Sequence, residues 1–491
     1  MTSRSKNAVR TYETEIEKSR EESNWKKAVD LAQQLKTRSP QHESLAHFLI
    51  GEGKLEAYLD DWPPIKDNIE RAQRELSEAR GYLTLATDEA GKKAGVALDA
   101  HLLLGKLNYA CGAYDEALKQ YKLAELNTLT EKELPVRSLR IVAESYAIKG
   151  LCLEQNAQAG AAPASTSRYK QAEREADMIR SFELSSELTL LYLQRASAAR
   201  AGATLETALQ RAPLLHIRAG RLQSAIDRYR EMLTAVESVS TQALRLTLAR
   251  QLAEVLMRGV TGQVYKAPEK LAVIPQQGTL TRRREEHVSE GPWKPRKYAG
   301  FNQFVPRNEY EEVILLLLVG EAMAVRDAVL SQSAEFEAAR AHSLHNAVAV
   351  IDLLVLASVR WGQLALVLES LERSMKFSFG CAHIWRQRAL ATATAARLPA
   401  AASASAALLP AAPAPGSPLW SANVRALGVA RRAAPLAKDD CALRLVAANT
   451  CFRAGWIEDG IEFAEEALSI EEQRDGPLLA RCLLHVGIGY Q

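Results

Sequence analysis

The sequence has no long apolar run. Its longest apolar stretches are VILLLLV at 313–319 and AVAVIDLLVLASV at 347–359, and Asp352 interrupts the second. Both are shorter than the ~20 residues that a helix needs to span a bilayer. The N-terminal residues, MTSRSKNAVRTYETEIEKSR, also lack the apolar core of a signal peptide. These absences predict a soluble, cytosolic chain.

Cysteine is scarce and scattered. No CxxC pair occurs among the six cysteines, which are Cys111, Cys152, Cys381, Cys441, Cys451 and Cys482. This spacing predicts no disulfide framework and favours a reducing compartment. Several of these cysteines stand in apolar helical sequence, where a free thiol behaves as a small core residue.

Neither sign of charge is in large excess. The chain has 62 Lys and Arg against 59 Asp and Glu, a net charge of +3. That balance gives no general argument for binding nucleic acid or an anionic membrane. We therefore predict no nucleic-acid partner.

The residue sets that carry catalysis are missing too. Gly51-Glu52-Gly53 has no third glycine and no preceding strand, so we interpret it as a turn and not as a phosphate loop. His342 and His345 stand three apart on a predicted helix, and Cys381 is two residues from His383, but neither pair has enough ligands for a metal site. No G-x-S-x-G or HExxH motif occurs. We predict no enzyme activity, no catalytic or metal-binding residues and no cofactor.

What the sequence does contain is a helical repeat. Residues 101–124, HLLLGKLNYACGAYDEALKQYKLA, have the spacing of a tetratricopeptide repeat, a helix-turn-helix unit of about 34 residues. Its repeat-packing positions are Leu104, Gly105, Gly112, Tyr114, Ala117, Tyr121 and Ala124. One hairpin cannot bury its own apolar face, so others must stack against it. We predict an all-α, tetratricopeptide-type α-solenoid of stacked helix hairpins with one long irregular loop.

Each small residue in this repeat has a predicted role. Gly112 is expected to end the first helix with a positive φ. Gly105 offers a low surface to the second helix, and Ala117 is small because the two helices cross there. The groove-facing positions, expected to form a generic protein-binding surface, are Leu102, Lys106 and Tyr109.

Periodicity and turn residues divide the chain into five parts. We predict an N-terminal helical, tetratricopeptide-like array at 1–259, a long loop at 260–308, helical hairpins at 309–396, a low-complexity Ala/Pro segment at 397–418 and a tetratricopeptide array at 419–491. The last helix has no polar capping repeat after it. We interpret the final array as incomplete, with C-terminal repeats missing.

The loop at 260–308 has no helical period, is basic and is unusually aromatic. Its candidate partner-docking residues are Arg282, Arg283, Arg284, Trp293, Tyr298, Phe301 and Phe304. A loop this long is normally functional or disordered, and a solvating linker rarely carries four aromatics. Three interpretations stay open: docking of a partner protein on aromatic anchors with an arginine rim, simple disorder, and contact with acidic lipid or RNA.

Longer blocks of sequence resemble the tetratricopeptide repeat protein 7 family. They occur in family order and are RIVAESYAIKGLCLE at 140–154, LRLTLARQLAEVLMRG at 244–259, TLTRR at 279–283, EEVILLLLVGEAMAVRDAVLS at 311–331, and LERSMKF at 371–377 leading to His383-Ile384-Trp385. The resemblance covers most of the chain, but the Ala/Pro-rich residues 397–418 depart from it. Family members are also longer.

The resemblance implies a non-catalytic scaffold of the plasma-membrane phosphatidylinositol 4-kinase complex, which supports phosphatidylinositol 4-phosphate synthesis. Family members bind the phosphatidylinositol 4-kinase type III alpha and a hyccin-like subunit, and link them to a palmitoylated membrane-anchor protein. The implied location is cytoplasmic and peripheral at the plasma membrane through these partners. The alternative is a generic tetratricopeptide adaptor in a chaperone or trafficking complex.

Overall fold

The computed structural model describes almost all of its regular structure as helix. The described residues are 2–131, 133–159, 168–196, 201–260, 264–270, 287–288, 294–298, 304–326, 333–396 and 413–491. Within these ranges the exceptions are two short strands, β1 (His287–Val288) and β2 (Lys297–Tyr298), which pair antiparallel. The prediction of an all-α protein is confirmed.

The helices pack into two units. Unit 1 comprises Met1–Leu248 and Pro268–Val305, and unit 2 comprises Ala249–Ala267 and Pro306–Gln491. The described residues within 268–305, which the sequence assigns to a separate loop, therefore group with the N-terminal helices.

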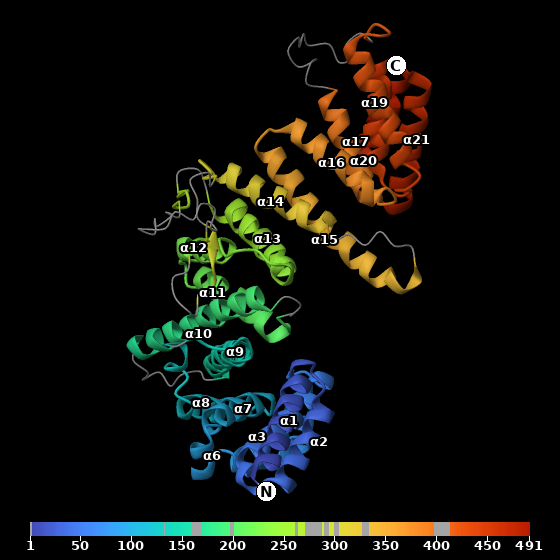
Figure 1. Cartoon of the computed structure of the whole chain (residues 1–491). Coiled ribbons are helices and arrows are strands. Elements are labelled where there is room, and N and C mark those ends of the chain that lie inside the picture. The colour runs from blue at the N-terminus through green and yellow to red at the C-terminus, as the bar shows by residue number, and fades with distance from the viewer. Residues whose placement is uncertain are drawn as a thin grey trace, which may run out of the picture. The chain divides into compact units, whose positions relative to one another are not determined.

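Unit 1 is an array of helix hairpins (Figure 1). Its helices are α1 (Thr2–Glu21), α2 (Trp25–Arg38), α3 (Glu43–Asp61), α4 (Ile69–Glu75), α5 (Ser77–Leu85), α6 (Glu89–Ala94), α7 (Ala97–Ala110), α8 (Tyr114–Leu123), α9 (Val136–Ala159), α10 (Arg168–Arg195), α11 (Ala203–Arg218), α12 (Leu222–Leu233) and the first part of α13 (Gln242–Gly259). The pairs α2/α3, α7/α8, α9/α10 and α11/α12 pack together, and α9 also contacts α7 and α11. This is the stacking that a helix with one apolar face requires.

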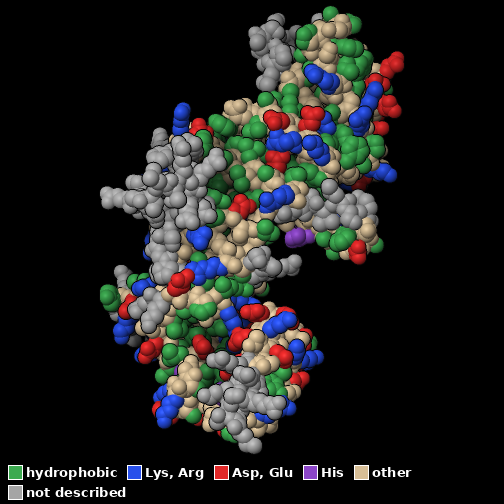
Figure 2. Space-filling model, in the orientation of Figure 1, with side chains coloured by type: hydrophobic (Ala, Val, Ile, Leu, Met, Phe, Trp, Pro, Cys, Tyr) green, Lys and Arg blue, Asp and Glu red, His purple; other side chains and the backbone are tan. Residues whose placement is uncertain are grey.

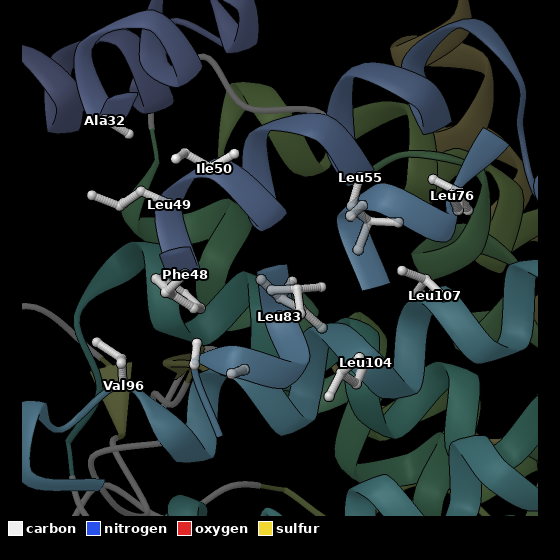
Figure 3. Close-up of a cluster of buried hydrophobic side chains, with 14 of the residues drawn as sticks. Ala32, Phe48, Leu49, Ile50, Leu55, Leu76, Leu83, Val96, Leu104 and Leu107 are labelled. Carbon is white, nitrogen blue, oxygen red and sulfur yellow. The ribbon is translucent and has the colours of Figure 1, made fainter. Parts of the chain in front are cut away.

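One apolar cluster of unit 1 joins α1–α3 to α4, α5 and α7. Its buried members include Phe48, Ile50, Leu55, Leu83 and Leu107, and Figure 3 shows them converging from these helices. Side chains this large, less than 5% exposed, stabilise the array by about 1.5–3 kcal/mol each relative to exposure.

Two glycines in α3 correct the predicted turn at Gly51-Glu52-Gly53. Both lie inside the helix, not in a turn. A Cβ built on Gly51 would lie 2.7 Å from Leu83 Cγ, and one on Gly53 would lie 2.5 Å from Val29 Cγ2. The glycines are therefore explained by the close approach of neighbouring helices, which periodicity alone does not reveal.

The helical residues 69–85 are divided into α4 and α5. The break falls at Leu76, whose ψ of 3° departs from helical geometry. The Leu76 side chain is 2% exposed and lies in the same apolar cluster as Leu55 and Leu107 (Figure 3). Burial of this side chain outweighs the helical preference of the flanking sequence.

Unit 2 continues with helix hairpins (Figure 1). After the second part of α13, its helices are α14 (Glu309–Arg326), α15 (Glu337–Arg360), α16 (Leu364–Ser378), α17 (Ala382–Ala395), α19 (Pro418–Ala433), α20 (Cys441–Ala454), α21 (Ile457–Arg474) and α22 (Leu479–Tyr490). Most of the predicted Ala/Pro segment lies outside the described residues. Its last residues lead into α19, where the Trp420 N–H donates to the Ser417 hydroxyl at 3.2 Å and caps the helix.

One helix among the described residues, Ala334–Arg360, is long and apolar enough to span a membrane by length and composition alone. A third of its apolar window is buried inside the fold. Ile351 belongs to a buried cluster with Val367 and Leu371 of α16. We interpret this helix as part of the core of unit 2.

The six cysteines are free thiols, and five of them are buried. Burial raises the pKa of the Cys152 and Cys451 thiols to about 12. A thiol with so high a pKa is a poor nucleophile and metal ligand at neutral pH, so these two act as small core residues.

Candidate interaction surfaces

The opening repeat is held together by the close approach of α7 and α8. A Cβ built on Gly105 would lie 2.5 Å from the Tyr121 ring, so only glycine fits there without displacing the ring. Gly112 adopts φ +75° in the turn between the helices, where a side chain would be strained. The other repeat positions buried at this crossing are Leu104, Ala117 and Ala124.

The positions predicted to face an open groove are placed differently. Leu102 is 1% exposed and belongs to the core, and Lys106 is enclosed between two glutamates. Tyr109 is half-buried, and its ring centroid lies 5.9 Å from that of Tyr114 at the start of α8. The groove prediction is therefore wrong for Leu102 and Lys106, because the face they occupy packs against α3 and α9.

Lys106 joins three helices. Its Nζ lies 2.6 Å from Glu56 Oε1 on α3 and 2.9 Å from Glu144 Oε2 on α9. Burial alone would lower the pKa of Lys106, but Glu144 and Glu56 outweigh it and raise the pKa above its ordinary value. Burial raises the pKa of Glu56, while Lys106 and Arg140 overcome burial to lower that of Glu144. The ammonium thus bridges consecutive hairpins.

A second ion cluster joins α1, α3 and α9. Glu52 is 3% exposed; its Oε2 forms an ion pair with Arg20, whose Nη2 lies 2.7 Å away, and its Oε1 accepts a hydrogen bond from Arg137. Arg137 Nη1 is 3.0 Å from Glu17 Oε2 as well. In both clusters the charged side chains pair with one another inside unit 1. They are therefore not available to bind a partner protein.

Residues 294–298, which we call the docked segment, lie against the end of α12. The Val236 N–H donates to Arg296 O at 2.6 Å, and the Tyr298 N–H donates to Thr234 O at 2.8 Å. Between these bonds, Ala235 and Lys297 form an antiparallel bridge. The docked segment therefore adds a short strand to residues 234–236 in addition to its pairing with β1.

The side chain of Gln194, near the end of α10, recognises the same backbone. Its Oε1 accepts from the Arg296 N–H at 3.0 Å, and its Nε2 lies 3.3 Å from Arg296 O and 2.5 Å from Val236 O. One amide thus satisfies both main-chain groups of Arg296 and ties the docked segment to the turn after α12.

Lys297 is one of the two buried side chains of the docked segment, and the other is Pro295. Lys297 is 6% exposed, and its Nζ lies 3.1 Å from Glu231 Oε1. Arg228 Nη1 lies 2.7 Å from Glu231 Oε2 and 3.1 Å from Glu187 Oε1. Burial alone would raise the pKa of Glu231, but Arg228 and Lys297 hold it below its ordinary value. Both cations therefore face an ionised Glu231 at neutral pH.

The predicted docking residues of the loop are only partly described. Arg282, Arg283, Arg284, Trp293 and Phe301 lie outside the described residues. Phe304 is 59% exposed, and Tyr298 is 41% exposed with its hydroxyl accepting from the Glu237 N–H at 3.2 Å. The partner-docking role of these residues stays a prediction.

Sequence reasoning missed the receiving side of this contact, which we call the α12 rim: Gln194, Glu231 and residues 234–236. Gln194 is 102 residues from Arg296 in the chain, and nothing in the local sequence connects them. The sequence offered one signal for an extended segment here. A proline favours extended backbone at the residue before it, and Pro295 is followed by Lys297 beside the aromatic Tyr298.

The histidines considered as metal ligands have other partners. His383 Nε2 is 2.9 Å from Asp352 Oδ1, and His342 Nε2 is 3.0 Å from Asn346 Nδ2. Among the residues that the structure describes, no three His, Cys, Asp or Glu side chains gather as a metal site would require.

Charges of both signs are interspersed on the molecular face in Figure 2. This distribution matches the near balance of 62 basic and 59 acidic residues.

The amino-acid sequence is similar to those of one known protein family. A family model described as "Tetratricopeptide repeat protein 7 N-terminal" matches residues 1–371. Tetratricopeptide repeat protein 7B of Homo sapiens is 34% identical over 99% of this chain and 57% of its own length. Tetratricopeptide repeat protein 7A of Homo sapiens is 29% identical over 97% of this chain and 56% of its own length. The chain therefore spans little more than half the length of these relatives.

Among solved structures, the TPR2AB domain of yeast Sti1 is 10% identical and matches 81% of this chain and 100% of that chain. The TM-score is 0.24, and a superposition this loose allows no comparison of individual positions.

Proposed function

The chain belongs to the tetratricopeptide repeat protein 7 family, and from this membership we propose that it is a non-catalytic scaffold that assembles a phosphatidylinositol 4-kinase complex and localises it at the plasma membrane. The observation that carries the proposal is the family match over residues 1–371. Stacked helix hairpins support a scaffold role because such arrays present extended surfaces to partners. In this role the chain supports phosphatidylinositol 4-phosphate synthesis by another protein's active site.

The proposed partners are the phosphatidylinositol 4-kinase type III alpha, a hyccin-like subunit and a palmitoylated membrane-anchor protein. The proposed location is the cytoplasmic face of the plasma membrane, reached through these partners. Indirect contact fits a chain with a net charge of only +3, because a surface that bound anionic lipid by itself would need a basic cluster.

The proposed contact region within unit 1 is the aromatic and basic part of the loop. Phe304 is 59% exposed, and exposed aromatic side chains are the residues that most often carry binding energy. The docked segment fixes one point of this loop to α10 and α12 through Gln194 and Lys297. Residues 294–298 are thereby held against the helices of unit 1.

The scaffold proposal is tested by expressing the tagged chain in cells and identifying the proteins that copurify. We expect recovery of the kinase and the hyccin-like subunit at levels well above those with an unrelated tetratricopeptide protein. Recovery of chaperone or trafficking components in their place would support the generic adaptor and overturn the proposal.

The loop contribution is tested by replacing Trp293, Phe301 and Phe304 with serine together. We expect kinase recovery to fall about tenfold or more, because anchor side chains dominate interface energies. The matched control replaces two exposed apolar residues outside the loop, Leu123 and Val239, which are 56% and 86% exposed. Equal recovery with both variants would remove the loop from the interface while leaving the scaffold role intact.

A further inference from the structure

The α12 rim recognises its occupant mainly through the main chain. Residues 234 and 236 and the Gln194 amide satisfy the polar backbone groups of Arg296 and the N–H of Tyr298. Sites of this kind, in which an extended segment adds a strand, gain affinity from the backbone and specificity from alternate side chains. Here the one side chain of the docked segment enclosed by charge is Lys297.

The α12 rim is held in place by bonds that do not involve its occupant. Arg245 donates from Nη1 to Ala235 O and from Nη2 to Leu233 O, both at 2.7 Å. Arg228 donates to Glu183 O at 2.9 Å while it pairs with Glu231. The backbone of residues 233–235 and the Glu231 carboxylate are therefore each held by contacts that do not involve the docked segment.

The contact itself is short. It includes two bonds between backbones, the Gln194 amide, a bond from the Glu237 N–H to the Tyr298 hydroxyl and the Lys297–Glu231 ion pair, and Tyr298 at its end remains 41% exposed. A tether raises the effective concentration of a segment to the millimolar range, so the segment stays bound in cis without high intrinsic affinity. A free peptide of the same chemistry meets the same donors and acceptors.

We propose that the α12 rim is a binding site for extended, lysine-containing peptide segments, occupied in cis by residues 294–298 and able to accept an equivalent segment from a partner protein when the cis segment leaves. The site recognises the backbone groups of two alternate residues, Arg296 and Tyr298, and the ammonium group of the residue between them. This recognition does not depend on the kinase scaffold role, so either can fail without the other.

The specificity of the site resides in Glu231. A lysine ammonium places a compact charge 3.1 Å from its Oε1, on the side opposite Arg228, which occupies Oε2. A methionine at this position would fill the same space without the charge. The lysine-to-methionine change in the peptide therefore separates charge recognition from apolar filling.

The test uses a fluorescein-labelled peptide, PWKPRKYAG, which reproduces residues 292–300. Its binding is measured by fluorescence anisotropy to the natural chain and to a chain with Lys297→Glu and Tyr298→Pro. The first substitution opposes Glu231 with a like charge, and the second removes the N–H that bonds to Thr234 O. Circular dichroism checks that the variant keeps its helices, and Tyr298→Pro alone is the milder variant if it does not.

We call the variant with Lys297→Glu and Tyr298→Pro the vacated chain, because its own segment should leave the α12 rim. We expect the peptide to bind the vacated chain about tenfold more tightly than the natural chain, in which the tethered segment competes. A peptide carrying Lys297→Met should bind the vacated chain more weakly, and so should the natural peptide when Glu231→Gln is added to that chain. Binding to neither chain would overturn the proposal. Equal binding of the lysine and methionine peptides would also overturn it, since the site would not then read the ammonium.

Discussion

Unit 1 joins helices of different hairpins through ion pairs in which both side chains are buried, whereas the described part of unit 2 has no such pair. Lys106 and its partners Glu56 and Glu144 are each at most 15% exposed, and the Arg20 and Glu52 side chains are 9% and 4% exposed. In the described part of unit 2, every ion pair has at least one side chain 35% or more exposed.

Unit 2 relies more on small side chains at its helix crossings. Four of the six buried members of the cluster around Trp385 are alanines, namely Ala389, Ala430, Ala433 and Ala447, and the other two are Trp385 itself and Leu443. A buried ion pair requires a particular partner in a particular place, while an alanine crossing requires only that the space stay small. Substitutions that remove a buried charge should therefore destabilise unit 1, and substitutions that enlarge a buried side chain should destabilise unit 2.

The largest effect is expected for Lys106→Met. The substitution keeps the aliphatic stem but leaves Glu56 and Glu144 buried without their cation, which should cost about 3–5 kcal/mol of unfolding free energy. Hydrogen exchange should become faster in α3, α7 and α9 and remain unchanged in α20. Unchanged exchange in α7 would show that the ion pairs do not hold unit 1 together.

Two further variants isolate the role of burial. Lys119→Met removes an ion pair with Glu116 at 2.6 Å in which both side chains are more than half exposed, so no measurable change is expected. Adding Glu56→Gln and Glu144→Gln to Lys106→Met removes the unpaired buried charges and should restore much of the lost stability. If the triple variant did not recover stability, the loss in Lys106→Met would be due to altered packing and not to the unpaired charges.

A smaller effect is expected for Ala447→Leu in unit 2. Ala447 is 1% exposed within the cluster around Trp385, and overpacking such a site should cost about 1–3 kcal/mol. Exchange should become faster in α19 and α20 and not in α7. Ala341→Leu, at an exposed position on α15, adds the same atoms without crowding and should leave exchange as it is.

The difference between contacts within one hairpin and contacts between hairpins explains what could be predicted from the sequence. Gly105, Gly112 and Ala117 lie within one hairpin, where fixed spacing relates each residue to its neighbours, and their placement follows from the repeat pattern. Longer sequence blocks, such as 140–154 and 244–259, were enough to identify the family, which the comparisons confirm.

The partners of Lys106 could not be read in this way. Glu56 and Glu144 are 50 and 38 residues away, and periodicity assigns a residue to a helix face without naming what packs there. The same reason hides the docked segment, since its partners Gln194 and Glu231 belong to helices that carry no local mark of a strand-binding edge. Contacts between hairpins are set by the geometry of the stack, which the repeat pattern leaves open.

The smallest expected effect concerns acidification of unit 1. Arg228 and Lys297 hold the pKa of Glu231 below the ordinary value of 4.5. A carboxylate with a lowered pKa in the folded state stabilises it fully above the ordinary pKa, and this contribution is lost as the pH falls through the lowered value. Between pH 6 and pH 3.5 the docked segment should therefore loosen, and hydrogen exchange at the amides of Val236 and Tyr298 should become faster.

Glu231→Gln separates this titration from general acid unfolding. The variant lacks the charge at every pH, so exchange at these two amides should already be faster at pH 6 and should show less additional pH dependence after correction for intrinsic rates. The change should be modest, because the Glu231 side chain is 37% exposed and solvent weakens its ion pairs. Helix α20 serves as the internal reference, since its exchange should not differ between the two chains. If the natural chain and the variant kept the same pH dependence at Val236, Glu231 would not control the docked segment, and the contrast between charge-held and volume-held helices would have to rest on Lys106 alone.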